Sequence, residues 1–286
     1  TQKVGYETLA SLPKEAHSVK MLSLDKTKSV DDLADWLGDK TGLLSWKLDG
    51  LTIVLTYREG TLYKAVTRGN GEIGEVITPN AKVFANLPVR IPFDGELVLR
   101  GEAIITYSTF EKINAELPEL EAKYKNPRNL CSGTVRQLNN KITAQRDVRF
   151  VAFTLVNGED HDFALRSEQL AWLSRLGFDV VESHEVTART LQLTIDLFQR
   201  EVAGNDMPSD GLVLTLDDIA YGESLGATAK FPRDSIAFKW RDEIRETRLL
   251  EIEWSASRTG LINPIAIFEP VELEGTTVSR ASVHNL

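Results

Sequence analysis

Runs of β-branched and aromatic apolar residues recur along the chain and predict strands. Leu51 to Tyr57 is one such run, and Arg58-Glu59-Gly60 separates it from a second run, Thr61 to Thr67. This spacing, with a glycine in the connection, predicts an antiparallel hairpin. The same pattern predicts further strands over 96–105, 212–216, 236–240, 249–254 and 265–268.

Apolar residues at helical spacing occupy shorter stretches between these strands. Ser29 precedes one of them as a helix cap, and Asp31 and Asp32 place negative charge in the first turn, which predicts a helix over 29–37. Other helices are predicted over 106–117, 167–176 and 191–202. Because the helices are scattered among hairpin-like strands, we expect an α+β fold with antiparallel sheets rather than a repeating β-α-β fold.

The sequence changes character near Glu251. Beyond this residue it predicts strands and turns without a helix, over a length too short for a complete β-barrel. We therefore expect a leading segment and helix over 1–42, a main domain over 43–250, and the incomplete start of a second domain over 251–286.

The net charge of the chain and the distribution of its charged residues limit the classes of function that fit the sequence. The 286 residues carry a net charge of −9, which argues against a protein that simply coats nucleic acid. One basic segment between 123 and 149 departs from this total, and it is either a phosphate-binding surface or a solvated face. Against the single acid Asp147, its cations are Lys123, Lys125, Arg128, Arg136, Lys141, Arg146 and Arg149.

Other features of the composition are ordinary for a globular protein, with 42% hydrophobic and 26% charged residues. The single Cys131 excludes an internal disulfide framework and a cysteine-based zinc site within this chain. No apolar run approaches the roughly 18–20 residues of a membrane span, so we expect no membrane partner. We expect a cytoplasmic location, and a start at Thr1 instead of Met predicts a piece of a longer protein.

Candidate chemistry lies where charged residues adjoin glycine. Lys47-Leu48-Asp49-Gly50 precedes the first strong strand, and a lysine becomes a nucleophile once its amine is neutral. Arg68 adjoins Gly69, and a guanidinium suits phosphate or ribose oxygens. Taken singly, each pattern is also typical of a surface turn. The remaining candidates are Arg100-Gly101-Glu102, Asn126-Pro127-Arg128-Asn129, Asp210-Gly211, and Lys239 within an apolar strand.

In this order and at these separations, the motifs resemble the adenylation domain of bacterial NAD-dependent DNA ligases, within the nucleotidyltransferase superfamily. The resemblance spans nearly the whole chain, and the ordered set is specific although no single motif is. It implies an α+β, ATP-grasp-like nucleotidyltransferase domain with antiparallel sheets, followed by part of an oligonucleotide-binding (OB-fold) β-barrel. The other motifs that carry this resemblance are Met21-Leu22-Ser23-Leu24-Asp25, Gly133 with Arg136-Gln137-Leu138, Ile236-Ala237-Phe238-Lys239, and Arg258-Thr259-Gly260.

The resemblance also implies a reaction. Lys47 would take AMP from NAD and release nicotinamide mononucleotide, and the AMP would pass to the 5′-phosphate of nicked DNA. The 3′-hydroxyl would then seal the nick. Lys239 would supply positive charge near the phosphate. NAD, magnesium and nicked double-stranded DNA are the implied cofactors and partners, and we expect a monomer.

Further site residues follow from the same resemblance. Asp49 and Glu102 would hold ribose hydroxyls or position a metal. Asp210 would support the nucleotide or, with Glu102, a magnesium ion. The resemblance further implies nucleotide contacts from Ser23, Leu24 and Arg68. It also implies that Arg128 and Arg136 contact phosphates, either of the nucleotide or of nicked DNA.

The chain departs from the family pattern at several positions. Ser45 stands where the family has a glutamate that contacts adenine, Thr215 where it has a lysine, and Trp240-Arg241 where it has Phe-Pro. The family's domain that binds nicotinamide mononucleotide has no counterpart here, so we expect poor use of NAD. These departures keep two alternatives open. One is a divergent nucleotidyltransferase that uses ATP as donor or RNA as acceptor, and the other is a nucleic-acid-binding relative without adenylation activity.

Overall fold

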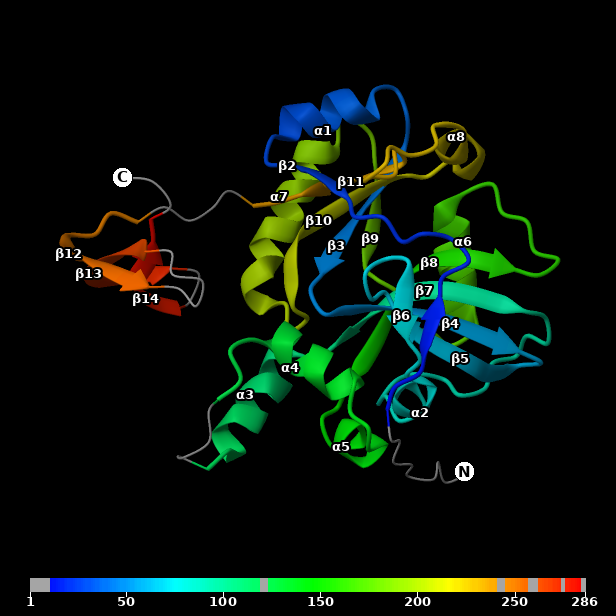
Figure 1. Ribbon diagram of the computed structural model, residues 1–286. Helices are drawn as coiled ribbons and strands as arrows, with labels where there is room; N and C mark the ends of the chain where they lie inside the picture. The colour runs from blue at the N-terminus through cyan, green and yellow to red at the C-terminus, as the bar shows by residue number, and fades with distance from the viewer. Residues whose placement is uncertain (1–10, 119–122, 241–244, 257–261, 274–275, 284–286) are drawn as a thin grey trace. The chain divides into compact units, whose positions relative to one another are not determined.

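A computed structural model describes residues 11–118, 123–240, 245–256, 262–273 and 276–283 (Figure 1). The chain divides into two compact units, Thr1–Lys239 and Trp240–Leu286. Arg258-Thr259-Gly260 of the family resemblance, and Arg241 of the departures from it, lie outside the described residues. Among the described helices, none is long and apolar enough to cross a membrane.

The first sheet of the larger unit carries the lysine motif. Its strands follow the order β2 (Asp25–Thr27), β11 (Ser235–Phe238), β10 (Ser209–Leu216), β3 (Gly42–Leu48) and β9 (Ser183–Val186). Neighbours pair antiparallel, except for the parallel pair of β2 and β11. Because β2 is one of its strands, the leading segment is part of this unit.

Two helices, α1 (Val30–Leu37) and α7 (Leu191–Glu201), cover one face of this sheet (Figure 1). Trp46 of β3 meets Phe198 of α7 edge to face, with ring centroids 4.7 Å apart. Since side chains alternate along a strand, Ser45 and Lys47 lie on the opposite face. That face keeps Ser45, Lys47 and Thr215 partly exposed, so the fold presents the lysine on the open side of the sheet.

The second sheet has the order β5 (Thr61–Thr67), β4 (Leu51–Arg58), β7 (Leu97–Ile104) and β8 (Arg149–Gly158), all antiparallel. One face forms the main core, in which Ile53, Leu55 and Leu99 are fully buried. The helices α2 (Thr78–Ala81), α4 (Pro127–Val135) and α6 (Arg166–Arg175) contribute buried residues to the same core. Glu102 lies on the other face of this sheet.

The remaining elements form two smaller sheets and several short helices. A two-stranded sheet pairs β1 (Lys14–Ala16) with β6 (Ile73–Glu75). In the smaller unit, β12 (Leu249–Ala256), β13 (Ile262–Leu273) and β14 (Thr276–Ser282) form an antiparallel sheet, and its described part contains no closed barrel. The other helices are α3 (Tyr107–Glu116), α5 (Asn140–Ala144), α8 (Ile219–Ser224) and the short 3₁₀ helix η1 (Val202–Gly204).

The predicted antiparallel α+β fold is confirmed, and so are several of its elements. The Ser29 side chain accepts a hydrogen bond from the backbone of Asp32 and caps α1. The hairpin of β4 and β5 forms as predicted. Strand β3 was missed, although it carries Lys47. The segment after Asn126, for which a surface turn and no helix was expected, is the helix α4, capped by the Asn126 side chain.

Candidate active site

Three predicted residues meet at one carboxylate. Lys47 donates from Nζ to Oδ1 of Asp210 at 2.8 Å, and Lys239 donates to the other oxygen, Oδ2. The side chains of Lys47, Lys239 and Asp210 are 26%, 27% and 29% exposed, so a ligand can reach all three. Two cations around one anion leave a local excess of positive charge, which suits a phosphate.

A break in strand register brings Asp210 to the lysines. The pairing of β10 with β3 shifts between Ser209 and Leu212. Gly211 lies in this break at a φ of 148°, and a Cβ atom there would stand 2.1 Å from the backbone oxygen of Phe238. Only glycine, which has no Cβ atom, tolerates that approach. The position of Asp210 beside the lysines therefore depends on the glycine that follows it.

The two lysines also set the ionisation of Asp210. Burial raises the pKa of the Asp210 carboxyl, but the hydrogen bonds from Lys239 and Lys47 and the charges of both lysines together outweigh burial, and the net pKa lies below its ordinary value. The Asp210 carboxylate therefore remains charged at neutral pH and holds both ammonium groups in place.

The Asp49-Gly50 turn joins β3 to β4 and connects the two sheets. Asp49 accepts a hydrogen bond at Oδ1 from Nη1 of Arg128 at 2.9 Å. The backbone N–H of Gly50 donates to Oε1 of Glu102 at 3.1 Å, and the Thr52 hydroxyl donates to Oε2 at 2.8 Å. Thr52, which the sequence did not single out, therefore orients Glu102.

Glu102 is 8% exposed. Burial raises the pKa of its carboxyl to about 7, while the hydrogen bonds from Thr52 and Gly50 and the charges of Lys47 and Arg128 act in the opposite direction. A buried carboxyl that titrates near neutrality is typical of functional sites.

Arg68 lies against the leading segment. Its Nη2 donates to the Ser23 hydroxyl at 3.0 Å, and its guanidinium also reaches the backbone oxygen of Met21 at 3.4 Å. Leu24 follows, half-buried. The structure thus brings the predicted nucleotide-binding residues Ser23 and Arg68 together, although their roles stay predictions.

The two predicted DNA-contacting arginines are both paired within the chain. Arg128 pairs with Asp49, as above, and Nε of Arg136 lies 3.4 Å from Oε2 of Glu75. Their side chains are still 60% and 40% exposed. A phosphate at either arginine would exchange with an existing acidic partner.

Two of the departures from the family pattern, Ser45 and Thr215, lie on the open face of the first sheet. Ser45 stands between Val213 of β10 and Ser183 of β9. The Thr215 hydroxyl accepts a hydrogen bond from Ser235 at 3.2 Å. Hydroxyls therefore replace charged groups at both positions, and the local charge rests on Lys47, Lys239 and Asp210.

The predicted magnesium ligands, Glu102 and Asp210, do not form a metal cage by themselves. The described residues contain no cluster of three or more histidine, cysteine, aspartate or glutamate side chains that could hold a metal. Both oxygens of Asp210 already accept from lysines. Mg²⁺ commonly uses one or two carboxylates together with substrate phosphates, so an all-protein site does not fit and the ion stays a prediction.

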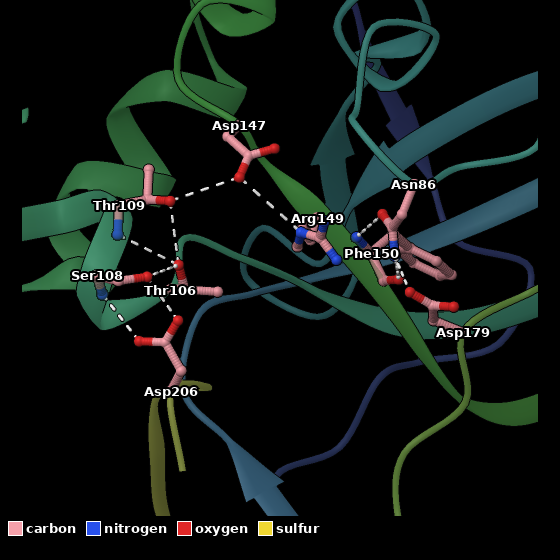
Figure 2. A network of polar contacts seen from close by, with 9 residues as sticks. All are labelled: Asn86, Thr106, Ser108, Thr109, Asp147, Arg149, Phe150, Asp179 and Asp206. Atoms are coloured by element: carbon pink, nitrogen blue, oxygen red, sulfur yellow. Dashed lines mark hydrogen bonds and ion pairs between the residues drawn. The ribbon is translucent and has the colours of Figure 1, made fainter. Parts of the chain in front are cut away.

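A surface depression of about 590 Å³ lies apart from the lysine site. Figure 2 shows its polar groups, which satisfy one another. Asp206 accepts from the backbone N–H and the hydroxyl of Ser108, at 2.8 and 2.6 Å, and Asn86 bonds to both Asp179 and the backbone of Phe150. These contacts secure the start of α3 and the edge of β8, which indicates a structural role.

Comparison with known proteins identifies the family. The family model of the NAD-dependent DNA ligase adenylation domain matches residues 9–243. This chain belongs to the NAD-dependent DNA ligase family. The model of that family's OB-fold domain matches residues 246–286, so both parts of the predicted ligase fold, adenylation domain and OB-fold domain, are confirmed.

Curated relatives agree with this assignment. A DNA ligase of Lachnoclostridium phytofermentans is 68% identical over 100% of this chain and 44% of its own length. A DNA ligase of Ruminiclostridium cellulolyticum is 66% identical over 99% of this chain and 43% of its own length. The chain thus spans less than half of these relatives. The solved structure "mycobacterial DNA ligase D complexed with ATP and MES" aligns over 92% of this chain and 72% of its own, with 13% identity and a TM-score of 0.45, too low to add to the assignment.

Proposed function

We propose that this chain is the adenylation core of an NAD-dependent DNA ligase and that Lys47 is its nucleophile. The observation that carries the proposal is the shared carboxylate of Asp210, which holds Lys47 and Lys239 side by side on the open face of a sheet. Membership of the ligase family supports the choice of NAD as donor.

In the first step, the neutral Nζ of Lys47 attacks the α-phosphorus of NAD. A phosphorus–nitrogen bond forms, the bond from that phosphorus to the bridging oxygen breaks, and nicotinamide mononucleotide leaves with the electron pair. The Lys47 ammonium loses one proton to solvent before the attack, and the proton released as the phosphorus–nitrogen bond forms passes to Oδ1 of Asp210, which accepts the Lys47 hydrogen bond. Lys239, fixed beside Lys47 by Asp210, is placed to stabilise the charge that develops on the phosphate oxygens.

Other residues of the site hold the rest of the nucleotide in this proposal. Glu102, oriented by Thr52 and Gly50, and Asp49 accept hydrogen bonds from ribose hydroxyls. Arg68 with Ser23 and Leu24 lines the nucleoside. Magnesium would neutralise phosphate charge through phosphate oxygens and at most one or two of these carboxylates, and no step here depends on its position.

The AMP then passes to nicked duplex DNA. Arg128 and Arg136 release their acidic partners, Asp49 and Glu75, and bind DNA phosphates instead. The 3′-hydroxyl then attacks the activated 5′-phosphate, which releases AMP and seals the strand. We further propose that the protein is a monomer and is located in the cytoplasm.

Intact-protein mass spectrometry tests which donor is used. After separate incubations with NAD and with ATP, we expect a mass gain equal to AMP with NAD, abolished in Lys47→Arg because arginine stays protonated. A mass gain with ATP alone would favour a divergent nucleotidyltransferase, the alternative that Ser45 and Thr215 leave open. No gain in a folded protein would favour a binding relative without adenylation activity.

A further inference from the structure

Arg100 shares a sheet face with the proposed active site. It lies on β7 two residues before Glu102, and its register partners are Val54 of β4 and Thr154 of β8. Because side chains alternate along a strand, Arg100 and Glu102 occupy the same face, the one to which Thr52 donates its hydrogen bond. The opposite face of β7 is the buried core, with Leu97 and Leu99 fully enclosed.

The Arg100 guanidinium is half-buried and lacks a partner. Its Nε is fully buried without a hydrogen-bond acceptor, and within the described residues no ion pair or hydrogen bond joins its side chain to another group. Burial alone accounts for a lowered pKa of Arg100, with no nearby acid acting against it. Arg166 differs, since its Nε is also buried but its Nη2 reaches Asp234 at 2.6 Å.

An unpaired, desolvated charge destabilises the folded chain. Such a loss of folding stability is expected at a site where a bound ligand supplies the missing anion. The planar guanidinium matches the paired oxygens of a phosphate, and Arg100 lies one alternate position along β7 from Glu102. The free chain thus holds a cation ready for an incoming phosphate.

We propose that Arg100 is a phosphate-binding residue of the substrate site. This assignment rests on the proposed function, because that function supplies the two phosphate sources, namely the NAD pyrophosphate and the DNA backbone. Arg100 would donate two N–H groups to phosphate oxygens and would be desolvated at no further cost on binding.

The first test compares Arg100→Met with the matched control Arg175→Met, which alters an exposed arginine at the end of α6. Without ligand, Arg100→Met should melt at the wild-type temperature or higher, because it removes a buried charge that has no partner. A melting temperature clearly below that of Arg175→Met would mean that Arg100 has a structural partner, and would overturn the proposal.

The second test measures the NAD concentration that half-saturates AMP labelling and, separately, the Kd for a nicked duplex. Arg100→Met should weaken one of these by about tenfold, which identifies the phosphate source, while Arg175→Met changes neither. Arg100→Lys, which keeps the charge but loses the fork, should fall between wild type and Arg100→Met.

Unchanged values in both measurements would also overturn the assignment. A wild-type chain that takes up no AMP would contradict the proposed function itself. The affinity for the nicked duplex and the melting temperature would then decide the role of Arg100 without the labelling measurement.

Discussion

Individual side chains of the site follow from the ordered motifs, whereas their partners do not. The sequence indicated Lys47, Asp210 and Lys239 as one set, and the structure brings them together. The pairing of Arg128 with Asp49 was not predictable, because the two residues are 79 positions apart and no local pattern links them. The orphaned guanidinium of Arg100 likewise becomes visible only when the neighbouring strands are placed.

The Thr215 departure leads to a prediction about rate. Thr215 is partly exposed on the open face and contacts only a hydroxyl of Ser235 among the described hydrogen bonds. A well-placed charge at a reacting phosphate can be worth roughly 10²–10³-fold in rate. We expect Thr215→Lys to speed single-turnover AMP transfer by at least about tenfold, and Thr215→Met, similar in length but uncharged, to leave it unchanged. Equal rates in the two variants would contradict this.

Glu102 leads to a prediction about stability and pH. Burial raises the pKa of its carboxyl from 4.5 to about 7, so between these pH values the unfolded chain releases a proton that the folded chain keeps. The free energy of unfolding should therefore fall as pH rises through this interval, by about 3 kcal/mol at most.

Glu102→Gln removes this titration, so its free energy of unfolding should decline less over the same interval. Chemical unfolding across this pH range, followed by fluorescence of the buried Trp46 and Trp172, measures the difference. Parallel pH curves for wild type and variant would show that Glu102 ionises normally.

At the scale of elements, helices and strands with a local sequence signal were predicted correctly, whereas elements that depend on pairing with distant strands were not. The helix α1 was predictable because Ser29 caps it, and the hairpin because a glycine turn joins two β-branched runs. Strand β3 was missed although Leu44 to Leu48 alternates apolar and polar residues, because this alternation is short and lacks β-branched residues. Its extended form is fixed by pairing with β10 and β9 on either side. Helix α4 was missed although Asn126 and Pro127 mark its start, because Gly133, Thr134 and Val135 weaken the helical signal of so short a segment.

The turn between β3 and β4 leads to a prediction about packing. A Cβ atom on Gly50 would stand 2.0 Å from the backbone oxygen of Ala103 in β7. Gly50→Ala should therefore lower the free energy of unfolding by about 1–3 kcal/mol. Gly133→Ala, inside α4 with no atom within 4 Å of the new methyl group, should raise it by about 0.5–1 kcal/mol. Urea unfolding of both variants checks the contrast, and equal effects would contradict the close approach at Gly50.

At the scale of the whole molecule, the proposed function requires an acidic chain to bind DNA, which is also acidic. The net charge is −9, and both predicted DNA-contacting arginines are already paired with acids. If they hold DNA phosphates, Arg128→Ala with Arg136→Ala should weaken binding to a nicked duplex. It should also reduce the slope of log affinity against log salt by about 2, since each phosphate contact releases about 0.9 counterion.

The matched control removes the same charge elsewhere, with Arg175→Ala and Arg189→Ala at exposed positions of the same unit. This control should leave the salt slope unchanged. The same loss of slope in both double variants would mean that net charge, and not a specific contact, governs the affinity for DNA.

Covalent capture of AMP shows whether Lys47 is the nucleophile. After incubation with NAD, the protein is digested under conditions that preserve the phosphorus–nitrogen bond, and the modified peptide is sequenced by mass spectrometry. If Lys47 is the nucleophile, AMP is found on Lys47 in the wild type, and the Lys47→Arg variant stays folded and unmodified. AMP on another residue, or full labelling of Lys47→Arg, would contradict it.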